Sequence, residues 1–222
     1  MKALFDTDFK IHYGIISRGA IAVEHLVKNR SFDLDDKSTP PVVSIGNGQL
    51  SVNTTEDVDI LEYEKFINQC KAPRSFSNGR RRCDYLMTTH ASSSAVCLIE
   101  MTSATGSESK LSLPINDKNG NVIYPGGKKE KVEDQLSQSL QTMLEVPSIQ
   151  SDFAVRKRKI CLMSYIVYPY TSIIDRLRHP LMRFLGIESQ EVGNDGAIIS
   201  CPSIEAMGFE YRRISHKFAF KL

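Results

Sequence analysis

The segment Ile160–Tyr168 is the feature of this sequence that most constrains its fold. Its residues are apolar almost without interruption, instead of alternating between apolar and polar. A strand with this pattern is buried on both faces, as in a parallel or mixed sheet that helices cover. The elements expected along the chain are a helix, a hairpin, a second helix, this strand, a third helix and further strands. This order predicts an α/β protein with a mixed central β-sheet flanked by helices.

The length and composition of the chain are those of one globular domain. It has 222 residues, of which 41% are hydrophobic and 24% are charged. These values are near the globular norm and argue against a disordered chain. We therefore expect a single α/β domain over residues 1–222, with an N-terminal helix and loop extension (1–54). A core (55–170) and a C-terminal helix with strands (171–222) are expected to follow.

Three absences in the sequence bear on where the protein is expected to work. No run of about 18 apolar residues is present, so we expect no membrane partner. The segment Met1–Lys10 lacks the apolar stretch of a signal peptide. The five cysteines are odd in number and contain no Cys-x-x-Cys pair, which argues against a disulfide framework or a zinc knuckle. We therefore expect a cytoplasmic protein with reduced thiols.

Helices are predicted on both sides of a loop in the first third of the chain. One helix is expected within Arg18–Asn29 from its apolar spacing. A second is expected over residues 56–70, with Thr55 as its N-cap. The intervening residues 30–54 are rich in Asp, Ser, Pro, Gly and Asn, which predicts a loop with a short strand at Val42–Ile45.

A β-hairpin is predicted from Cys83–Thr89 and Ala95–Thr102, which are extended segments on either side of a Ser-rich turn. A turn centred near Ser92 gives directly opposed residues a constant index sum of about 184 or 185. Asp84 and Glu100 have the sum 184, so they are expected to face each other on one side of the sheet. A register shift of one residue would move one of them to the opposite face.

Two opposed carboxylates repel each other, so such a pair is expected to need a cation between them. Glu100 also ends an apolar strand, and a buried carboxylate needs a partner. Mg²⁺ is commonly held by one or two carboxylates together with water and phosphate oxygens, and it promotes phosphodiester hydrolysis. The alternative is that Asp84 or Glu100 points into solvent or pairs with Arg80, Arg81 or Arg82.

A further helix is predicted over 128–145, and basic residues cluster near its start. Gln135 precedes Leu136 on the apolar stripe of this helix, from where it could reach a site beside the hairpin. The basic clusters could neutralise nucleic-acid phosphates, or they could be solvated loops that balance the acidic stretch Glu56–Glu64. These clusters are Arg80–Arg82, then Lys128, Lys129 and Lys131, and finally Arg156–Lys159.

These motifs, taken in order, resemble the PD-(D/E)xK nuclease superfamily. The matching residues are Cys83-Asp84-Tyr85-Leu86, the apolar strand that ends in Glu100, and Gln135-Leu136 on the following helix. The resemblance implies a restriction-endonuclease-like fold, with Asp84 and Glu100 as ligands of Mg²⁺ or Mn²⁺ and Gln135 as a catalytic residue. It further implies DNA as the substrate and a role in restriction, repair or phage defence.

The sequence departs from the family at the lysine of the motif, which is replaced by Thr102. A threonine carries no positive charge, so a lysine from elsewhere would have to assist the reaction. Of the lysines at positions 110, 128, 129 and 131, we take Lys128 as the catalytic candidate. Lys129 and Lys131 join Arg80, Arg81 and Arg82 as expected DNA contacts.

Two further expectations follow from the resemblance. Glu64 is preferred to Glu24 and Glu62 as a third metal ligand, because it lies four residues after Ile60 near an apolar stripe. Cleavage of both DNA strands needs two sites, so a homodimer or a protein partner is expected. If no lysine replaces the missing one, the chain would instead be a catalytically inactive interaction or regulatory module.

Overall fold

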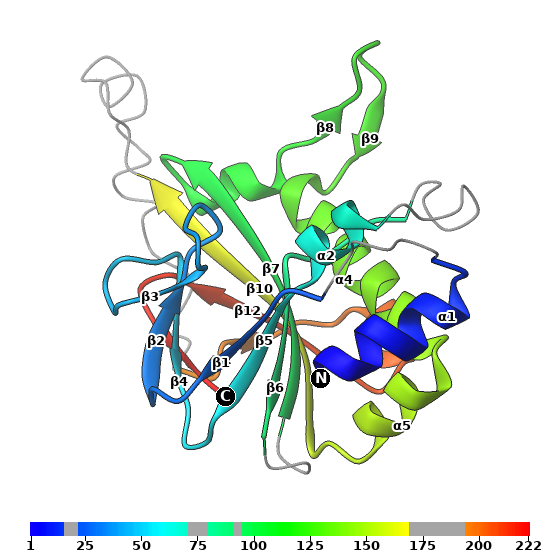
Figure 1. Ribbon diagram of the computed structural model, residues 1–222. Coiled ribbons are helices and arrows are strands. Elements are labelled where there is room, and N and C mark those ends of the chain that lie inside the picture. The colour runs from blue at the N-terminus through cyan, green and yellow to red at the C-terminus, as the bar shows by residue number, and fades with distance from the viewer. Residues whose placement is uncertain (16–21, 71–79, 91–94, 169–193) are drawn as a thin grey trace.

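The computed structural model describes residues 1–15, 22–70, 80–90, 95–168 and 194–222, and its centre is a mixed β-sheet (Figure 1). The third helix, expected near the start of residues 171–222, lies outside the described residues. The seven strands of the central sheet are, in spatial order, β1 (Glu24–Val27), β5 (Val58–Glu62), β6 (Tyr85–Thr89), β7 (Ala95–Thr105), β10 (Arg158–Tyr168), β12 (Glu210–Ser215) and β11 (Ala197–Ile198).

The directions of the strands confirm the prediction of a mixed sheet. Strands β1, β5, β6 and β7 form three consecutive antiparallel pairs, whereas β10 runs parallel to both β7 and β12. Short β11 is antiparallel to β12. The segment Ile160–Tyr168, predicted to be buried on both faces, thus belongs to a parallel strand near the middle of the sheet.

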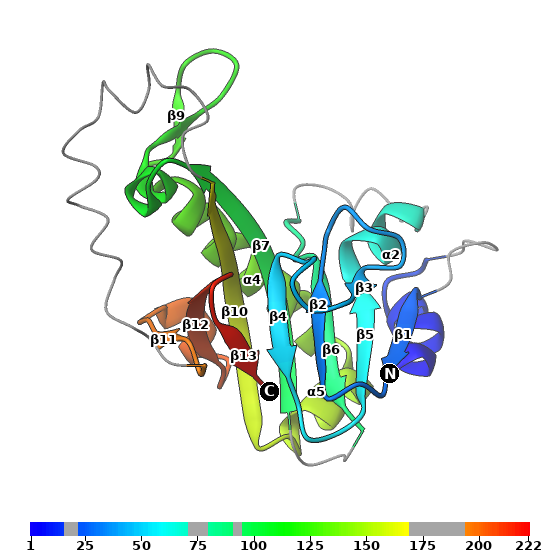
Figure 2. The same cartoon turned by 90° about the vertical axis from the view of Figure 1, so that its left-hand side faces the viewer.

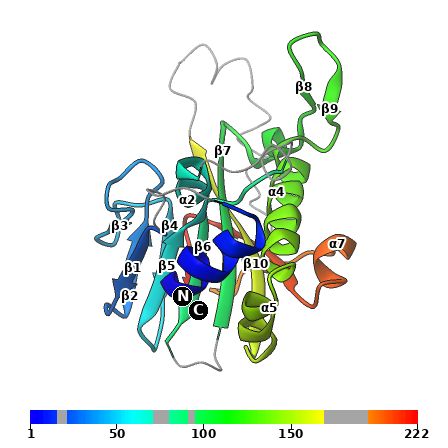
Figure 3. The same ribbon diagram turned by 45° about the vertical axis from the view of Figure 1, so that its right-hand side comes forward.

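Helices cover one face of the central sheet (Figure 3). The chain needs glycine at Gly127, where the longest helix begins, because φ is +71° and a Cβ would collide with the carbonyl oxygens of Leu111 and Leu113. No helix in the described part of the chain is both long and apolar enough to cross a bilayer. The helices are η1 (Leu4–Phe9), α1 (Lys10–His12), α2 (Tyr63–Gln69), η2 (Glu108–Ser112), α4 (Gly127–Leu144), α5 (Pro147–Ala154) and α7 (Pro202–Glu205).

A second sheet covers the opposite face (Figure 2). Its hydrophobic residues, such as Phe32 and Val52, share one core with residues of the central sheet such as Ile99. Its strands are β13 (Ala219–Lys221), β4 (Leu50–Asn53), β2 (Ser31–Leu34) and β3 (Val42–Val43), in that spatial order.

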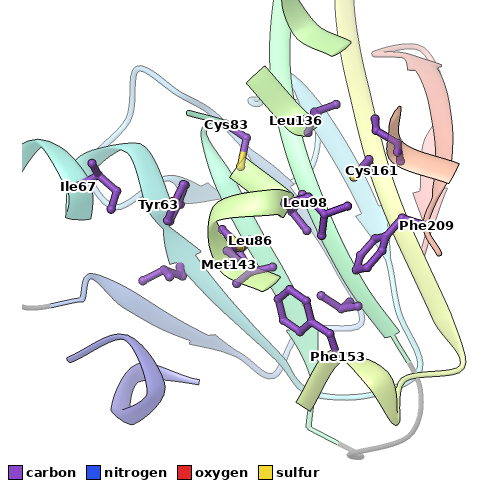
Figure 4. Packing of buried hydrophobic residues seen from close by; sticks show 14 of the residues in the cluster. Tyr63, Ile67, Cys83, Leu86, Leu98, Leu136, Met143, Phe153, Cys161 and Phe209 are labelled. Carbon is purple, nitrogen blue, oxygen red and sulfur yellow. The ribbon is translucent and has the colours of Figure 1, made fainter. Parts of the chain in front are cut away.

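Strand β7 contributes alternate side chains to the two cores. Val96 and Leu98 belong to the core under the helices, and Figure 4 shows Leu98 there beside Leu86 and Leu136. Cys97 and Ile99 belong to the core under the second sheet. All the strand's side chains from Val96 to Ile99 are fully buried, because successive residues point to opposite faces and both faces are covered.

A small hairpin of β8 (Ile115–Asn116) and β9 (Val122–Tyr124) rises away from the body of the molecule (Figures 1 and 3). The structure has a turn at Asn119-Gly120, at the tip of this hairpin, where Gly120 has φ of +87°. It also confirms the helix predicted over 128–145 and the hairpin of β6 and β7.

The helices predicted at Arg18–Asn29 and 56–70 are wrong over much of their length. Residues 24–27 and 58–62 pair as the antiparallel strands β1 and β5, and only Tyr63–Gln69 is helical. In β5, Val58 and Ile60 enter one core and Leu61 enters the other. Burial on both faces removes the polar alternation that would have revealed a strand, so apolar spacing was read as helical.

The loop predicted over residues 30–54 is also largely wrong, because it contains three strands of the second sheet. Only the short strand at Val42–Val43 was expected. The other two strands are each just four residues long, and turn-forming residues surround them. Tertiary packing on the central sheet decided their structure, since local propensity is weaker than burial.

The double burial around β7 and β10 predicts where the fold is most sensitive. Leu162 of β10 is fully buried, so Leu162→Ala should lower the free energy of unfolding by about 2–5 kcal/mol through lost burial and a cavity. Leu113→Ala, at a side chain that is 56% exposed, should change it by less than about 1 kcal/mol. Urea unfolding monitored by circular dichroism measures both, and equal losses would contradict this description of the core.

Candidate functional site

The register of β6 and β7 brings the two predicted acids to the same face of the sheet. Tyr85 pairs with Ile99 and Leu86 pairs with Leu98, which is the predicted index sum of 184. Asp84 and Glu100 lie one step further along, in phase with Leu86 and Leu98, whose side chains face the helices. A backbone hydrogen bond fixes this end of the hairpin, since the N–H of Met101 donates to Oδ2 of Asp84 at 2.7 Å.

The backbone of Asp84 also positions the start of helix α2. Its carbonyl oxygen accepts hydrogen bonds from the backbone N–H groups of Tyr63, at 2.9 Å, and Glu64, at 3.4 Å. Helix α2 therefore begins beside the acid pair and brings Glu64 into its electrostatic neighbourhood. The charge of Glu64 raises the pKa of both Asp84 and Glu100, in addition to the larger effect of burial.

Polar side chains of α4 hold the residues just before Asp84 against the helix. Gln135 Nε2 donates to the carbonyl oxygen of Arg82 at 2.9 Å. The N–H of Arg81 donates to Gln138, and the N–H of Cys83 donates to Ser139, at 2.8 and 2.7 Å. These three contacts place α4 against the start of β6, as the position of Gln135 on the apolar stripe predicted.

Two buried oxygen atoms at this site lack hydrogen-bond partners among the described residues. They are Oε2 of Glu100 and Oε1 of Gln135. The residue Glu100 is only 6% exposed, so solvent does not readily replace the missing partner. A buried polar oxygen without a partner is costly, and oxygen atoms of this kind are the ligands that Mg²⁺ prefers.

Burial dominates the electrostatics of the acid pair. Loss of hydration, together with the smaller effects of the charges of Asp84 and Glu64, raises the pKa of Glu100 to about 10. Burial also raises the pKa of Asp84 to about 7, although the hydrogen bond from Met101 acts in the opposite direction. At neutral pH, and without a bound cation, the pair therefore retains a proton on Glu100.

Lys131 is the lysine whose charge acts on both acids, and it lowers the pKa of each. It lies four residues before Gln135 on α4, so the two side chains share one face of the helix. Lys128, the predicted catalytic lysine, instead donates a hydrogen bond to the carbonyl oxygen of Ser103. The i, i+4 spacing from Gln135 is the sequence signal that would have selected Lys131 for the site.

Three other residues considered for the site, Lys129, Glu24 and Glu62, contact other residues of the protein. Lys129 lies 3.6 Å from Glu108. Glu24, an alternative metal ligand, accepts hydrogen bonds from the backbone N–H of Lys2. Glu62, the other alternative, lies 2.7 Å from His25 and 3.2 Å from Lys65.

The arginines before Asp84 also contact the protein itself, and none of their ion pairs in the described structure involves the acid pair. Arg80 lies 3.1 Å from Glu145 and stacks over the ring of Tyr13 at 5.2 Å. Arg81 lies 3.7 Å from Asp134. Arg82 donates a hydrogen bond of 2.6 Å to Asn68 of α2.

A pocket of about 390 Å³ opens beside Asp84, between the β2–β3 loop, α2 and the start of β6. Its wall includes the carboxylates of Asp36, Glu62, Glu64 and Asp84, with Lys65 as a cation among them. Asp36 was not predicted as part of the site, because residues 30–54 were read as a separate loop. The pocket gives solvent and small ligands access to Asp84.

No group of three Cys, His, Asp or Glu side chains is arranged to bind a metal ion within residues 1–15, 22–70, 80–90, 95–168 and 194–222. An ion at this site would therefore take one or two carboxylates from the protein, and water or phosphate oxygens would complete its shell. Mg²⁺ is commonly bound in this way. The unpartnered oxygen of Glu100 and the raised pKa values of the pair are compatible with such an ion.

Comparison with known proteins adds no relative to this description. No protein-family model, curated protein or solved structure matches the chain. The structure itself defines a mixed α/β protein with a seven-stranded sheet, several helices, a buried Glu100 and a partly buried Asp84 beside an open pocket.

The raised pKa of Glu100 predicts a pH dependence of stability. The folded protein retains a proton that an unfolded glutamate, with a pKa of about 4.3, would release. Protonated Glu100 therefore contributes its full stabilisation at pH values below the pKa of the unfolded glutamate. This stabilisation is lost as the pH rises toward the pKa of Glu100 in the folded protein, which is about 10. Between about pH 5 and 9, the free energy of unfolding of the metal-free protein should fall more steeply than that of Glu100→Gln.

Urea unfolding in EDTA at several pH values measures this slope. Glu210→Gln is the control, because Glu210 is exposed on β12 and should leave the slope unchanged. Parallel profiles for the wild-type protein and Glu100→Gln would show that Glu100 is not protonated in the folded state.

Proposed function

We propose that this protein is a metal-dependent nuclease with a restriction-endonuclease-like fold, which hydrolyses phosphodiester bonds in DNA. The observation that carries the proposal is the pair of Asp84, which is partly buried, and Glu100, which is buried, on one face of the β6–β7 hairpin. Acids whose pKa values are raised by burial and by each other's charge are typical of functional sites. The pocket beside Asp84 provides the access that a substrate needs.

The order of elements supports the same class. The hairpin with the acids is followed by α4, which carries Gln135, and then by β10, which runs parallel to β7. This is the order implied by the resemblance to the PD-(D/E)xK superfamily. Restriction, repair and phage defence are the roles that such a nuclease would fill in the cytoplasm.

Each residue of the site has a role that its contacts support. Asp84 and Glu100 would hold Mg²⁺ or Mn²⁺, and the negative charge of Glu64 at the start of α2 would favour the bound cation. When bound, the ion lowers the pKa of an attacking water and neutralises charge on the phosphate. Gln135 orients the segment before Asp84 by its hydrogen bond to Arg82.

Lys131 would supply the positive charge that Thr102 lacks. Its charge acts on both acids, and its ammonium has no carboxylate within ion-pair distance among the described residues. It is therefore able to stabilise negative charge on a phosphate in the transition state. Lys128, which hydrogen-bonds the end of β7, would instead fix the N-terminus of α4.

The second candidate function is a catalytically inactive interaction or regulatory module. The contacts of the arginines favour it, because Arg80 and Arg81 already pair with acids of α4 and its C-cap. Surface cations that are paired within a protein bind phosphates less readily. The two functions differ in whether metal-dependent cleavage depends on the acid pair.

Cleavage of supercoiled plasmid DNA with Mg²⁺ or Mn²⁺ tests the proposed activity. Asp84→Asn and Glu100→Gln should each reduce the rate by at least about a hundredfold, because each removes a metal ligand. Lys131→Met should reduce it by about 10²–10³-fold, and by more than Lys128→Met, if it stabilises the transition state.

Lys28→Met is the control for these variants, because Lys28 is exposed in the turn after β1. It should cleave at the wild-type rate. Cleavage that persists unchanged in Asp84→Asn and Glu100→Gln would place the active site elsewhere. Absence of cleavage with any divalent ion would favour the inactive module.

Metal binding should displace protons from the acid pair, since the ligands must be deprotonated. Titration calorimetry with Mn²⁺ at pH 7, in two buffers of different ionisation enthalpy, should show release of about one proton per ion. Affinity should increase with pH for the same reason. Glu100→Gln should abolish the proton release, whereas proton-independent binding by the wild-type protein would contradict the assigned protonation state.

A further inference from the structure

Residues 80–83 lead into strand β6 without belonging to a strand themselves. No strand pairs with them in the described part of the chain. Their last residue, Cys83, is fully buried in the core under the helices, and Figure 4 shows it in one cluster with Leu136 of α4. Backbone N–H and carbonyl groups in such a place need hydrogen-bond partners. Side chains of α4 supply these partners.

Four side chains of α4 form a polar seam that receives this segment. They share one stripe of the helix, because their spacing is i, i+3, i+4 and i+7. The seam consists of Gln135, Gln138, Ser139 and Thr142. Each residue of the segment makes a hydrogen bond to it. In order along residues 80–83, the partners are Thr142, Gln138, Gln135 and Ser139, at 3.0, 2.8, 2.9 and 2.7 Å. The seam therefore fixes the segment along its whole length.

Ser139 is the member of the seam that contacts the residue next to the acid pair. Its hydroxyl donates to the carbonyl oxygen of Gln135 at 2.7 Å, and its oxygen accepts the N–H of Cys83. The side chain is fully buried. A buried hydroxyl is costly unless it is hydrogen-bonded, so an apolar residue would serve packing alone equally well at this position. The partner of Ser139 outside its own helix is the residue immediately before Asp84.

Asp84 follows Cys83 by one peptide unit, and further contacts hold it in place. Its carbonyl oxygen accepts the N–H of Tyr63 at 2.9 Å, and its Oδ2 accepts the N–H of Met101 at 2.7 Å. With the bond from Cys83 to Ser139, these contacts fix Asp84 relative to α2, β7 and α4. A side chain that binds a metal ion needs to be held to within about 0.5 Å of its place by its supporting contacts.

We propose that Ser139 is a positioning residue, which sets the place of the Asp84 carboxylate through the backbone of Cys83. This inference rests on the proposed function, because it assigns to that site a residue that holds a metal ligand without touching the ion. Without the Ser139 hydroxyl, the buried N–H of Cys83 loses its acceptor, so the segment shifts toward another partner. Loss of such an outer contact typically lowers metal affinity by about 10–100-fold.

The affinity for Mn²⁺ at pH 7, measured by electron paramagnetic resonance of the free ion, tests this role without cleavage. Ser139→Ala should bind Mn²⁺ about 10–100-fold more weakly than the wild-type protein. Ser137→Ala is the matched control. The Ser137 hydroxyl also donates to a carbonyl oxygen of α4, that of Asp134, but makes no hydrogen bond to residues 80–83 in the described structure. It should keep the wild-type affinity, and unchanged affinity in Ser139→Ala would overturn the inference.

Val52→Ala separates positioning from a general loss of stability. Val52 is buried in the second sheet, in the core on the opposite face of the central sheet, so its truncation destabilises the fold without touching the seam. It should retain the wild-type affinity for Mn²⁺ at a temperature where circular dichroism shows every variant to be folded. A loss of affinity as large as that of Ser139→Ala would show that Ser139 acts through stability alone, which contradicts the inference.

Amide hydrogen exchange in the metal-free protein reports on Asp84 independently of any ion. The amide of Met101 should exchange slowly in the wild-type protein, because it donates to Asp84. In Ser139→Ala it should exchange at least about tenfold faster, relative to the amide of Leu98 in the same strand. Rapid exchange at Cys83 in the wild-type protein would show that the seam does not hold this segment, whether or not Ser139→Ala folds.

The two proposals fail in different ways. If the wild-type protein binds no Mn²⁺ but exchange at Met101 depends on Ser139, the assignment of the metal site fails and the positioning of Asp84 stands. If Mn²⁺ binding requires Asp84 and neither affinity nor exchange responds to Ser139→Ala, only the role of Ser139 fails.

Discussion

The burial of β7 on both faces is the constraint on which the rest of the structure depends. Helices cover Val96 and Leu98, and the second sheet covers Cys97 and Ile99. The same alternation then directs Glu100 toward the helices, where burial of a charged carboxylate costs several kcal/mol unless it is paired or protonated. The fold therefore places an acid where stability alone would favour an apolar residue, which is common at functional sites.

The parts of the site that depend on local pairing could be predicted from the sequence. The index sum of 184 predicted for the hairpin agrees with its register, in which Tyr85 pairs with Ile99 one step from Asp84 and Glu100. The strands β1 and β5 could not be predicted in this way, because their pairing joins segments 31 or more residues apart. Their residues 24–27 and 58–62 have apolar spacing that also suits a helix, and only the tertiary contacts distinguish the two.

The charged residues show the same division between local pattern and three-dimensional contact. The run Arg80–Arg82 is conspicuous in the sequence, but Arg80 and Arg81 pair with acids within the protein. Lys131 is one of three lysines at the start of α4, and only the helix geometry shows that its charge acts on Asp84 and Glu100. Charge clusters alone do not show which cations are available to a ligand, because intramolecular ion pairs are not visible in a composition.

Anomalous diffraction from crystals soaked in Mn²⁺ tests the central claim most directly. The account predicts an anomalous peak beside the carboxylates of Asp84 and Glu100, near the middle of β7 on the face that the helices cover. It also predicts that Glu100→Gln crystals lose this peak. A strong peak elsewhere, with none at the acid pair, would contradict the assignment of these residues as the metal site.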